Sequence, residues 1–492
     1  MIYTRGSQNA DKFTILKLSI SLCDSALENL RFSNQQTMRL SLLVEDSGST
    51  EGVLEVNGRY WKLMDFEIDD EMDTDDLDFD CISYTWGLGR EPHPFRPNIE
   101  VSDRTIPALK AFLYHHPICE RIWIDALCVP LEGKERAHTL ESMGYIYSKA
   151  KEVVAVLSNA TLPALEHMIA SDRIDTDDLH ILERDEWVSR AWTYQETVNS
   201  KVLYFTCEDA FDISVPASKF LNCIGYSLAQ LKCSAVEKLQ YYPRLSAFED
   251  VIADYYTAGY EGRSALQVMS NMDRRSQLRP EDHFYAMIGV ISTARASSIG
   301  NLEPCEAFMR LCEKKRDFSF IYSAAIRDQR PLRKWRPVSG ELPSILPWHG
   351  WGARQDGHLE DDGLRLDDML VVHPAPPQEM ARQFVQQWVT SFFGDHRNSN
   401  QKPEEAAYAT LQIMGFKGSS RCLTTTEGYF FPFETVTSEQ VIHLLISTAL
   451  RWVCGAPGLV SFENEVGKGI SYTPGVYVGE IDSRAATSVK LS

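Results

Sequence analysis

The sequence predicts an α/β protein whose first part holds a parallel β-sheet flanked by helices. The prediction depends on the stretch from Arg121 to Leu157, which reads RIWIDALCVPLEGKERAHTLESMGYIYSKAKEVVAVL. A short apolar run ends there at Asp125, and a β-branched run fills residues 153–157. Between the two runs, apolar residues recur every three or four positions, as on one face of a helix. A strand, a helix and a strand of these lengths form a right-handed crossover between parallel strands.

Further strands and helices are predicted on both sides of this crossover. Residues 38–44 are expected to form a first strand, and Asn57-Gly58 between alternating apolar residues indicates a hairpin. Residues 81–87 are typical of a strand that ends in a tight turn, because two glycines follow closely. Residues 201–205 are β-branched and aromatic and predict the last strand. Helices are expected at residues 107–114, 162–180 and 186–196.

Four segments are expected along the chain. They are an N-terminal lead-in at 1–80, an α/β domain at 81–206, a helical region at 207–340 and a mixed α+β C-terminal region at 341–492. Apolar residues at helical spacing, at 245–255 and 284–291, predict the helical region. A helix near 377–393 and glycine-punctuated β segments predict the mixed region.

The lead-in contains the predicted hairpin and an acidic segment. Residues 65–80 carry ten acidic residues and no basic one. This segment lacks the glycine and the spaced glutamate of a calcium-binding loop, so we interpret it as a solvated linker.

Composition excludes several classes of protein. The formal net charge of -20 argues against nucleic-acid binding, which needs a basic face, although it allows a local basic pocket. Eleven cysteines without a Cys-x-x-Cys pair favour free thiols in a reducing compartment. The longest apolar stretch, 441–453, is too short and too often interrupted to span a membrane. Residues 13–22 lack the features of a signal peptide, so a cytoplasmic protein is expected.

Common catalytic motifs are missing from the sequence. It has no Gly-x-Ser-x-Gly elbow, no phosphate-binding loop, no dinucleotide glycine fingerprint and no zinc signature. The adjacent pair His115-His116 is interpreted as surface, so no metal site is predicted. What remains is a set of polar and aromatic residues at predicted strand ends and helix starts. They are Ser83, Tyr84, Trp86, Asp125, Cys128, Arg190, Trp192 and Glu196.

Four ordered blocks of the sequence resemble the fungal heterokaryon incompatibility (HET) domain family. The blocks are CISYTWG at 81–87, IWIDALCV at 122–129, ER at 135–136 followed by MGYIYSKAKEVVAVL at 143–157, and RAWTYQE at 190–196. Weaker resemblance follows in RPEDHFYAMIGV at 279–290, LPSILPWHGW at 342–351 and RCLTTTEGYFF at 421–431.

This resemblance implies a role in fungal non-self recognition and in programmed cell death when incompatible cells fuse. The family is in turn distantly similar to Toll-receptor-type (TIR) domains, which implies a flavodoxin-like sheet over about residues 36–206. Some TIR domains are NAD glycohydrolases, and their essential glutamate has a context similar to Trp192-x-x-x-Glu196. By this resemblance Glu196 is the candidate catalytic residue and NAD the candidate substrate, with no cofactor or metal required.

The implied chemistry is consistent with the residue types. Cleavage of the nicotinamide–ribose bond gives the sugar oxocarbenium character, which a carboxylate stabilises without a metal. Trp86 or Trp192 would stack on a flat ring, and Arg190 would offset a diphosphate. The other residues expected to bind the substrate are Ser83, Tyr84, Asp125 and Cys128.

Each candidate also has a structural alternative. Trp192 is a large side chain that would suit a core, and Arg190 and Glu196 could pair with other charges. Asp125 could cap the element that follows its strand, and Cys128 could be a small buried apolar side chain.

Alternatives also exist for the function of the whole chain. The enzyme hypothesis implies an NAD-consuming domain that self-association switches on. One alternative is a non-enzymatic signalling module whose surface recruits a partner protein. Another is an inactive relative. Pro130 and Leu131 stand where the family usually has Asn or Asp followed by Gln.

Overall fold

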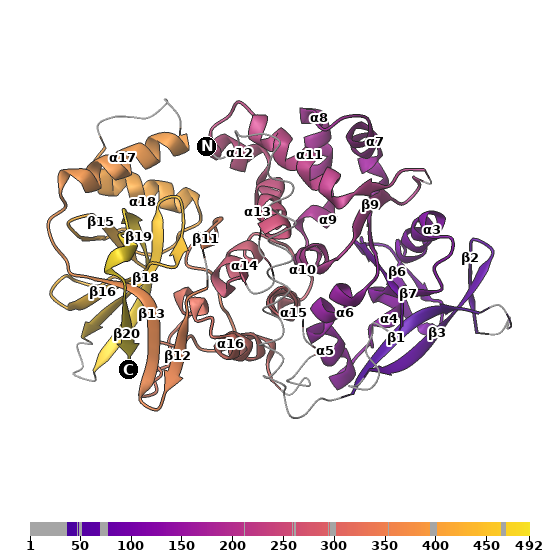
Figure 1. Cartoon of the computed structure of the whole chain (residues 1–492), viewed down its shortest axis with the longest axis horizontal. Helices are drawn as coiled ribbons and strands as arrows, with labels where there is room; N and C mark the ends of the chain where they lie inside the picture. Colours follow the sequence, from indigo (N-terminus) through magenta and orange to yellow (C-terminus); the bar gives the residue numbers. More distant parts are fainter. Residues whose placement is uncertain are drawn as a thin grey trace.

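Two large β-sheets lie at opposite sides of the molecule, with helices between them (Figure 1). The computed structural model describes residues 37–492 except 47, 49–51, 69–76, 211, 258, 260–261, 294, 296–301, 353, 394–400 and 464–468. Most of the buried apolar side chains form one continuous core, which extends from the first sheet through the helices to the second sheet.

The first sheet has eight strands among the described residues, in the order β10-β9-β8-β4-β7-β1-β3-β2. The central strands β9, β8, β4 and β7 are parallel, and the flanking strands are antiparallel. The predicted α/β class is therefore confirmed, although the sheet is mixed rather than entirely parallel. The strands are β1 (Met38–Glu45), β2 (Leu54–Val56), β3 (Arg59–Ile68), β4 (Asp80–Tyr84), β7 (Arg121–Ile124), β8 (Val153–Leu157), β9 (Leu203–Cys207) and β10 (Val215–Pro216).

The antiparallel edge of this sheet comes from the predicted hairpin. Asn57 and Gly58 both have positive φ, 54° and 72°, which is the conformation that a tight two-residue hairpin turn requires. The hairpin returns the chain as β3, which pairs with β1 along its length. Residues 65–68 of the predicted acidic linker therefore belong to a strand, where the Ser41 hydroxyl donates to Asp65 at 2.6 Å. Residues 69–76 of that linker lie outside the described residues.

The predicted crossover joins β7 to β8, and β4 lies between these two strands in the sheet. Strands β4 and β8 are buried along their whole length, as expected for central parallel strands that helices cover on both faces. The connection contains three helices instead of the one expected, with a break at Ser142. These helices are α4 (Asp125–Cys128), α5 (Gly133–Glu141) and α6 (Met143–Lys149).

The other helices of the α/β part cover the sheet. Helix α3 packs on β4, β8 and β9, while α7 packs on β9 and β10. The helix expected from residue 186 onward is interrupted at Arg190, whose backbone is extended. The bounds are α3 (Thr105–His115), α7 (Leu162–Ala170), α8 (Thr176–Arg184), α9 (Glu186–Ser189) and α10 (Ala191–Asn199), with the small hairpin β5 (Arg90–His93) and β6 (Arg96–Ser102) beside them.

Helices α11–α16 fill the region between the two sheets (Figure 1). Helix α15 contacts both α10 and α6, so this region packs directly against the crossover helices. The contact is close because Gly144 of α6 faces Gly289 of α15. The helices are α11 (Ala217–Gln230), α12 (Ala235–Tyr241), α13 (Pro243–Thr257), α14 (Ala265–Met272), α15 (Pro280–Ile291) and α16 (Pro304–Lys315).

The C-terminal part is an antiparallel sheet with two helices. Its order is β12-β13-β16-β18-β19-β15-β14, and β20 also pairs with β13. The elements are β12 (Gly357–Glu360), β13 (Gly363–Val372), α17 (Glu379–Phe393), α18 (Pro403–Ile413), β14 (Leu423–Thr424), β15 (Gly428–Pro432), β16 (Val441–Ser447), β18 (Gly455–Glu463), β19 (Ile470–Gly479) and β20 (Thr487–Leu491). A separate small ladder joins β11 (Trp351–Gly352) to β17 (Leu450–Arg451). In the described part of the chain, no helix combines the length and apolar character needed to cross a bilayer.

Candidate functional site

Two of the predicted site residues meet at the carboxyl edge of the parallel strands. Strands β4 and β7 pair in parallel, so the segments that follow them leave the sheet at the same edge. Trp86 follows β4 and Asp125 follows β7. The indole Nε1 of Trp86 donates to Asp125 Oδ2 at 2.9 Å, and the backbone N–H of Ala126 donates to Asp125 Oδ1 at 2.7 Å. The carboxylate of Asp125 is therefore held in place from two sides.

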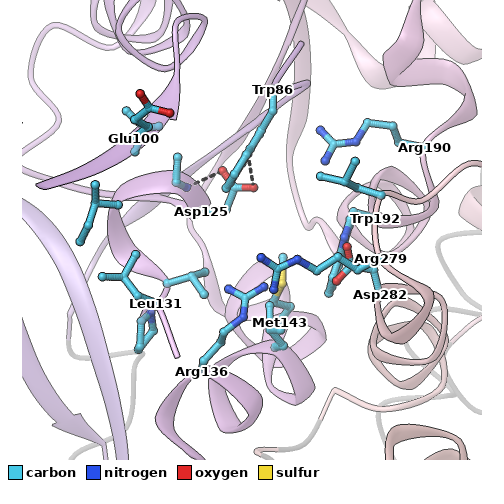
Figure 2. A pocket seen from close by; sticks show the side chains of 17 residues that line it. Trp86, Glu100, Asp125, Leu131, Arg136, Met143, Arg190, Trp192, Arg279 and Asp282 are labelled. Atoms are coloured by element: carbon cyan, nitrogen blue, oxygen red, sulfur yellow. Dashed lines mark hydrogen bonds between the residues drawn. The ribbon is translucent and has the colours of Figure 1, made fainter. Parts of the chain in front are cut away.

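A pocket of about 300 Å³ opens at this edge (Figure 2). This volume lies at the lower end of the range for small-molecule sites. The walls come from β6, from the segments after β4 and β7, from α5 and α6, from the start of α10 and from the start of α15 with the segment before it. The polar and aromatic lining residues include Trp86, Asp125, Arg136, Arg190, Trp192, Arg279 and Asp282.

The start of α10 supplies two predicted residues to the wall. Arg190 is the N-cap residue of α10, and its Nη1 donates to the carbonyl oxygen of Tyr84 at 3.2 Å. Trp192 lines the pocket and also packs against the core, so the predicted ligand role and the structural alternative are compatible. Asp282 also lines the pocket, so a second carboxylate lies on the same cavity as this indole ring.

Glu196 lies behind the pocket wall. Its side chain is buried, it accepts a hydrogen bond from the hydroxyl of Ser83, and it is not among the lining residues. Trp187 Nε1 donates to the same Ser83 hydroxyl at 2.8 Å, so the three side chains form a buried chain of hydrogen bonds. The prediction that Glu196 is catalytic stays a prediction, and the structure adds that its carboxylate does not face the cavity.

The two carboxylates differ in environment but influence each other. Burial raises the pKa of Glu196 to about 7, the hydrogen bond from Ser83 opposes this shift, and the negative charge of Asp125 adds to it. Burial also raises the pKa of Asp125, while the charge of Arg190 and the hydrogen bond from Trp86 lower it. Glu196 therefore gains a proton more readily than an exposed glutamate, and Asp125 is the carboxylate that the pocket exposes.

The other predicted residues are packed away from the cavity. Ser83 is buried in the chain just described. The hydroxyl of Tyr84 lies 2.8 Å from Thr105 Oγ1, and both side chains are buried. The thiol of Cys128 is buried 3.9 Å from the carbonyl oxygen of Ile122, and burial raises its pKa to about 12. For Cys128 this environment matches the alternative of a small buried apolar side chain.

The lining residues that were not predicted as site residues include Arg136, Met143, Arg279 and Asp282. Arg136 belongs to the ER block, and Arg279 and Asp282 belong to RPEDHFYAMIGV, so two quoted motifs contained them. The available signal was the charge of these motifs. Sequence spacing could not show that α5 and the segment before α15 lie on the same cavity.

One group of side chains away from the pocket has metal-ligand character. The ligand atoms of His167, Asp175 and Asp178 lie within 4.8 Å of one another. Their hydrogen bonds already explain the arrangement, because Asp175 and Asp178 form the capping box of α8 and His167 Nδ1 lies 2.8 Å from Asp178. We therefore interpret this group as a helix cap.

The fold and the pocket define an α/β protein with a ligand-sized site at the carboxyl edge of its parallel strands. Residues 79–181 match the family model described as Heterokaryon incompatibility protein (HET). The chain therefore contains a HET domain, and the resemblance is confirmed for the three sequence blocks between residues 81 and 157, whereas the block at 190–196 lies beyond the match. The match includes Trp86, Asp125 and Arg136, whereas α10 and α15 lie beyond it. Comparisons with curated proteins and with solved structures gave no match.

Proposed function

We propose that the pocket binds NAD and that the protein cleaves the nicotinamide–ribose bond, within a non-self response that ends in cell death. The observation that carries the proposal is the combination of two indole rings, three arginines and a half-buried carboxylate on one cavity. Aromatic rings, cations and a carboxylate are the groups that nucleobase-like rings, a diphosphate and an electron-poor ribose would each require.

The reaction follows from where the carboxylate lies. As nicotinamide leaves, positive charge develops at the ribose carbon, and the carboxylate of Asp125 faces the cavity in which that carbon would lie. Water then adds to this carbon and releases a proton, so NAD and water give ADP-ribose, nicotinamide and a proton. Trp86 both lines the cavity and donates to Asp125, so the same residue would stack on a ring and orient the carboxylate.

Glu196 keeps its predicted importance but acts from behind the wall. Its pKa of about 7 is suited to holding or releasing a proton near neutral pH. Its charge state depends on Asp125, and Ser83 links it to the end of β4. We infer that Asp125 contacts the ribose and that Glu196 is a positioning residue for this edge of the sheet.

The test is to incubate the full chain with NAD and to measure released nicotinamide by chromatography. Wild-type protein should release nicotinamide, and Asp125→Asn should lose at least about a hundredfold in rate, on the order of one electrostatic transition-state contact. Arg484→Gln is a matched control, because Arg484 is exposed and pairs only with Asp482 in the described chain. No release by the wild type, or equal release by Asp125→Asn, would exclude the proposed reaction.

A second candidate function is a binding module without catalysis. Pro130 and Leu131, which replace the polar pair usual in the family, both line the pocket. Their apolar side chains remove hydrogen-bonding groups from the wall beside Asp125. This alternative predicts that NAD binds without release of nicotinamide. The double substitution Pro130→Asn and Leu131→Gln should then create or increase release.

A further inference from the structure

Two arginines from distant parts of the chain converge in the pocket. Arg136 lies on α5, and Arg279 is the residue before α15. Both line the cavity, and Figure 2 shows their guanidinium groups near each other in it, one extending from α5 and the other from the segment before α15. Burial lowers the pKa of Arg136, and the positive charge of Arg279 lowers it further. Like charges repel, so two guanidinium groups on one cavity favour the binding of an anion there.

Hydrogen bonds and ion pairs do not explain the placement of these arginines. Among the described residues, neither guanidinium donates a hydrogen bond or forms an ion pair. Asp282 and Glu281 are the acidic groups whose charges favour the cation on Arg136. Both act on Arg136 through charge alone, because no hydrogen bond or ion pair joins either of them to Arg136. The N–H donors of Arg136 and Arg279 are therefore available to a ligand.

Arg190 differs from this pair. One of its nitrogens donates to the carbonyl oxygen of Tyr84, and its charge acts mainly on the carboxylates, since it lowers the pKa of both Asp125 and Glu196. Arg190 is thus committed to the carboxylate side of the pocket. The expected role of offsetting a diphosphate fits the other two arginines better.

We propose that Arg136 and Arg279 form a phosphate-binding subsite that holds the diphosphate of the ligand. A guanidinium presents a planar fork of donors that matches two phosphate oxygens, so two neighbouring forks suit two linked phosphates. The identity of the ligand as a dinucleotide rests on the proposed function. Binding of a diphosphate does not depend on whether any bond is cleaved.

The subsite also links two parts of the chain. Arg136 lies inside the segment that matches the HET family, and Arg279 lies outside it, in the helical region. The contact between Gly144 and Gly289 holds α6 against α15, so the two arginines are kept in register by backbone packing. The helical region therefore completes the site of the HET domain and does more than connect the two sheets.

The experiment is titration calorimetry of the full chain with inorganic pyrophosphate. Wild-type protein should bind it, and Arg136→Gln and Arg279→Gln should each weaken binding about tenfold or more, as expected for a lost charge-assisted hydrogen bond. Arg484→Gln should bind as the wild type does. No binding by the wild type, unchanged binding by either pocket variant, or equal weakening in Arg484→Gln would overturn the subsite.

Lysine variants separate geometry from charge. Arg136→Lys and Arg279→Lys keep the positive charge and should fold, but they lack the planar fork and should still weaken binding. If both lysine variants bind pyrophosphate as tightly as the wild type, the two-fork contact is overturned.

Steady-state cleavage of NAD then separates the two proposals. Bound pyrophosphate without any nicotinamide release would refute only the proposed reaction, whereas release with an unchanged KM in the arginine variants would refute only the subsite.

Discussion

The hydroxyl of Ser83 donates a hydrogen bond to the carboxylate of Glu196 and so ties the end of β4 to helix α10. Ser83 is buried, and its oxygen also accepts the Nε1–H of Trp187 at 2.8 Å. The hydroxyl group thus satisfies one buried donor and one buried acceptor at the same time. This bond places α10 relative to the sheet, and with it Arg190 and Trp192 at the pocket wall.

The first prediction concerns this shared hydroxyl. Ser83→Ala leaves the indole N–H of Trp187 without a partner and removes a hydrogen bond to Glu196, so it should lower the free energy of unfolding by about 1–3 kcal/mol. In the wild type, the hydrogen bond from Ser83 lowers the pKa of Glu196, so the substitution should raise this pKa further. Urea denaturation measures the first effect. Ser488→Ala, at an exposed serine that donates to Asp367, should change stability by less than about 0.5 kcal/mol.

The second prediction concerns the pH dependence that Glu196 gives to stability. Its pKa of about 7 in the folded protein exceeds the ordinary value of 4.5. Between these values the folded protein holds a proton that the unfolded chain releases, so the contribution of Glu196 to the free energy of unfolding falls as pH rises. The fall is at most about 3 kcal/mol. Glu196→Gln does not titrate, so its stability relative to wild type should increase from pH 5 to pH 8.

Denaturation of both proteins at several pH values measures this difference directly. Asp125→Asn is the matched variant, because removing the charge of Asp125 lowers the pKa of Glu196 and should narrow the pH range of the effect. A stability difference that stays constant from pH 5 to pH 8 would mean that the pKa of Glu196 is not raised.

Much of the fold could be predicted because its central strands are buried on both faces. Strands β4 and β8 consist mainly of apolar residues, and such runs are visible in a sequence. The turn at Asn57 and Gly58 was equally clear, because few residue pairs adopt positive φ. The break at Ser142 was not predicted. The apolar periodicity continues through it, and the break depends on how α6 packs against α15.

Half of the predicted site residues line the pocket, and the reason is geometric. Trp86 and Asp125 follow paired parallel strands, so their proximity could be inferred from the sheet. The position of Glu196 could not, because it lies four residues after Trp192 on α10, about 6 Å further along the helix axis and inside the core. Arg279 could not be predicted either, since only tertiary packing brings its segment to the pocket.

The third prediction separates the two roles of Trp86 in binding. Trp86→Phe keeps an aromatic ring but removes the Nε1–H that donates to Asp125, whereas Trp86→Ala removes both. For ADP-ribose, Trp86→Ala should weaken binding by about 1–3 kcal/mol, the usual value of one stacked base, and Trp86→Phe by less. In the wild type, the hydrogen bond from Trp86 lowers the pKa of Asp125. Trp86→Phe removes this bond and should therefore raise the pKa of Asp125. Calorimetry over a range of pH measures both the affinity for ADP-ribose and its dependence on the charge of Asp125. An equal loss of affinity in the two variants would argue against stacking.

The fourth prediction concerns the packing that joins the HET domain to the helical region. A Cβ atom at Gly144 would lie 2.3 Å from the carbonyl oxygen of Gly289 and 2.6 Å from that of Ser292, so α6 and α15 would have to separate. Gly144→Ala should therefore destabilise the protein by about 1–3 kcal/mol or more, although alanine is the better helix former. Gly225→Ala in α11 is the control, because its Cβ would meet only the side chain of Ile252 at 3.7 Å. That variant should be as stable as the wild type or more stable.

Since Arg279 immediately precedes α15, Gly144→Ala should also weaken pyrophosphate binding. Tight binding together with lost stability would show that the subsite does not depend on this contact.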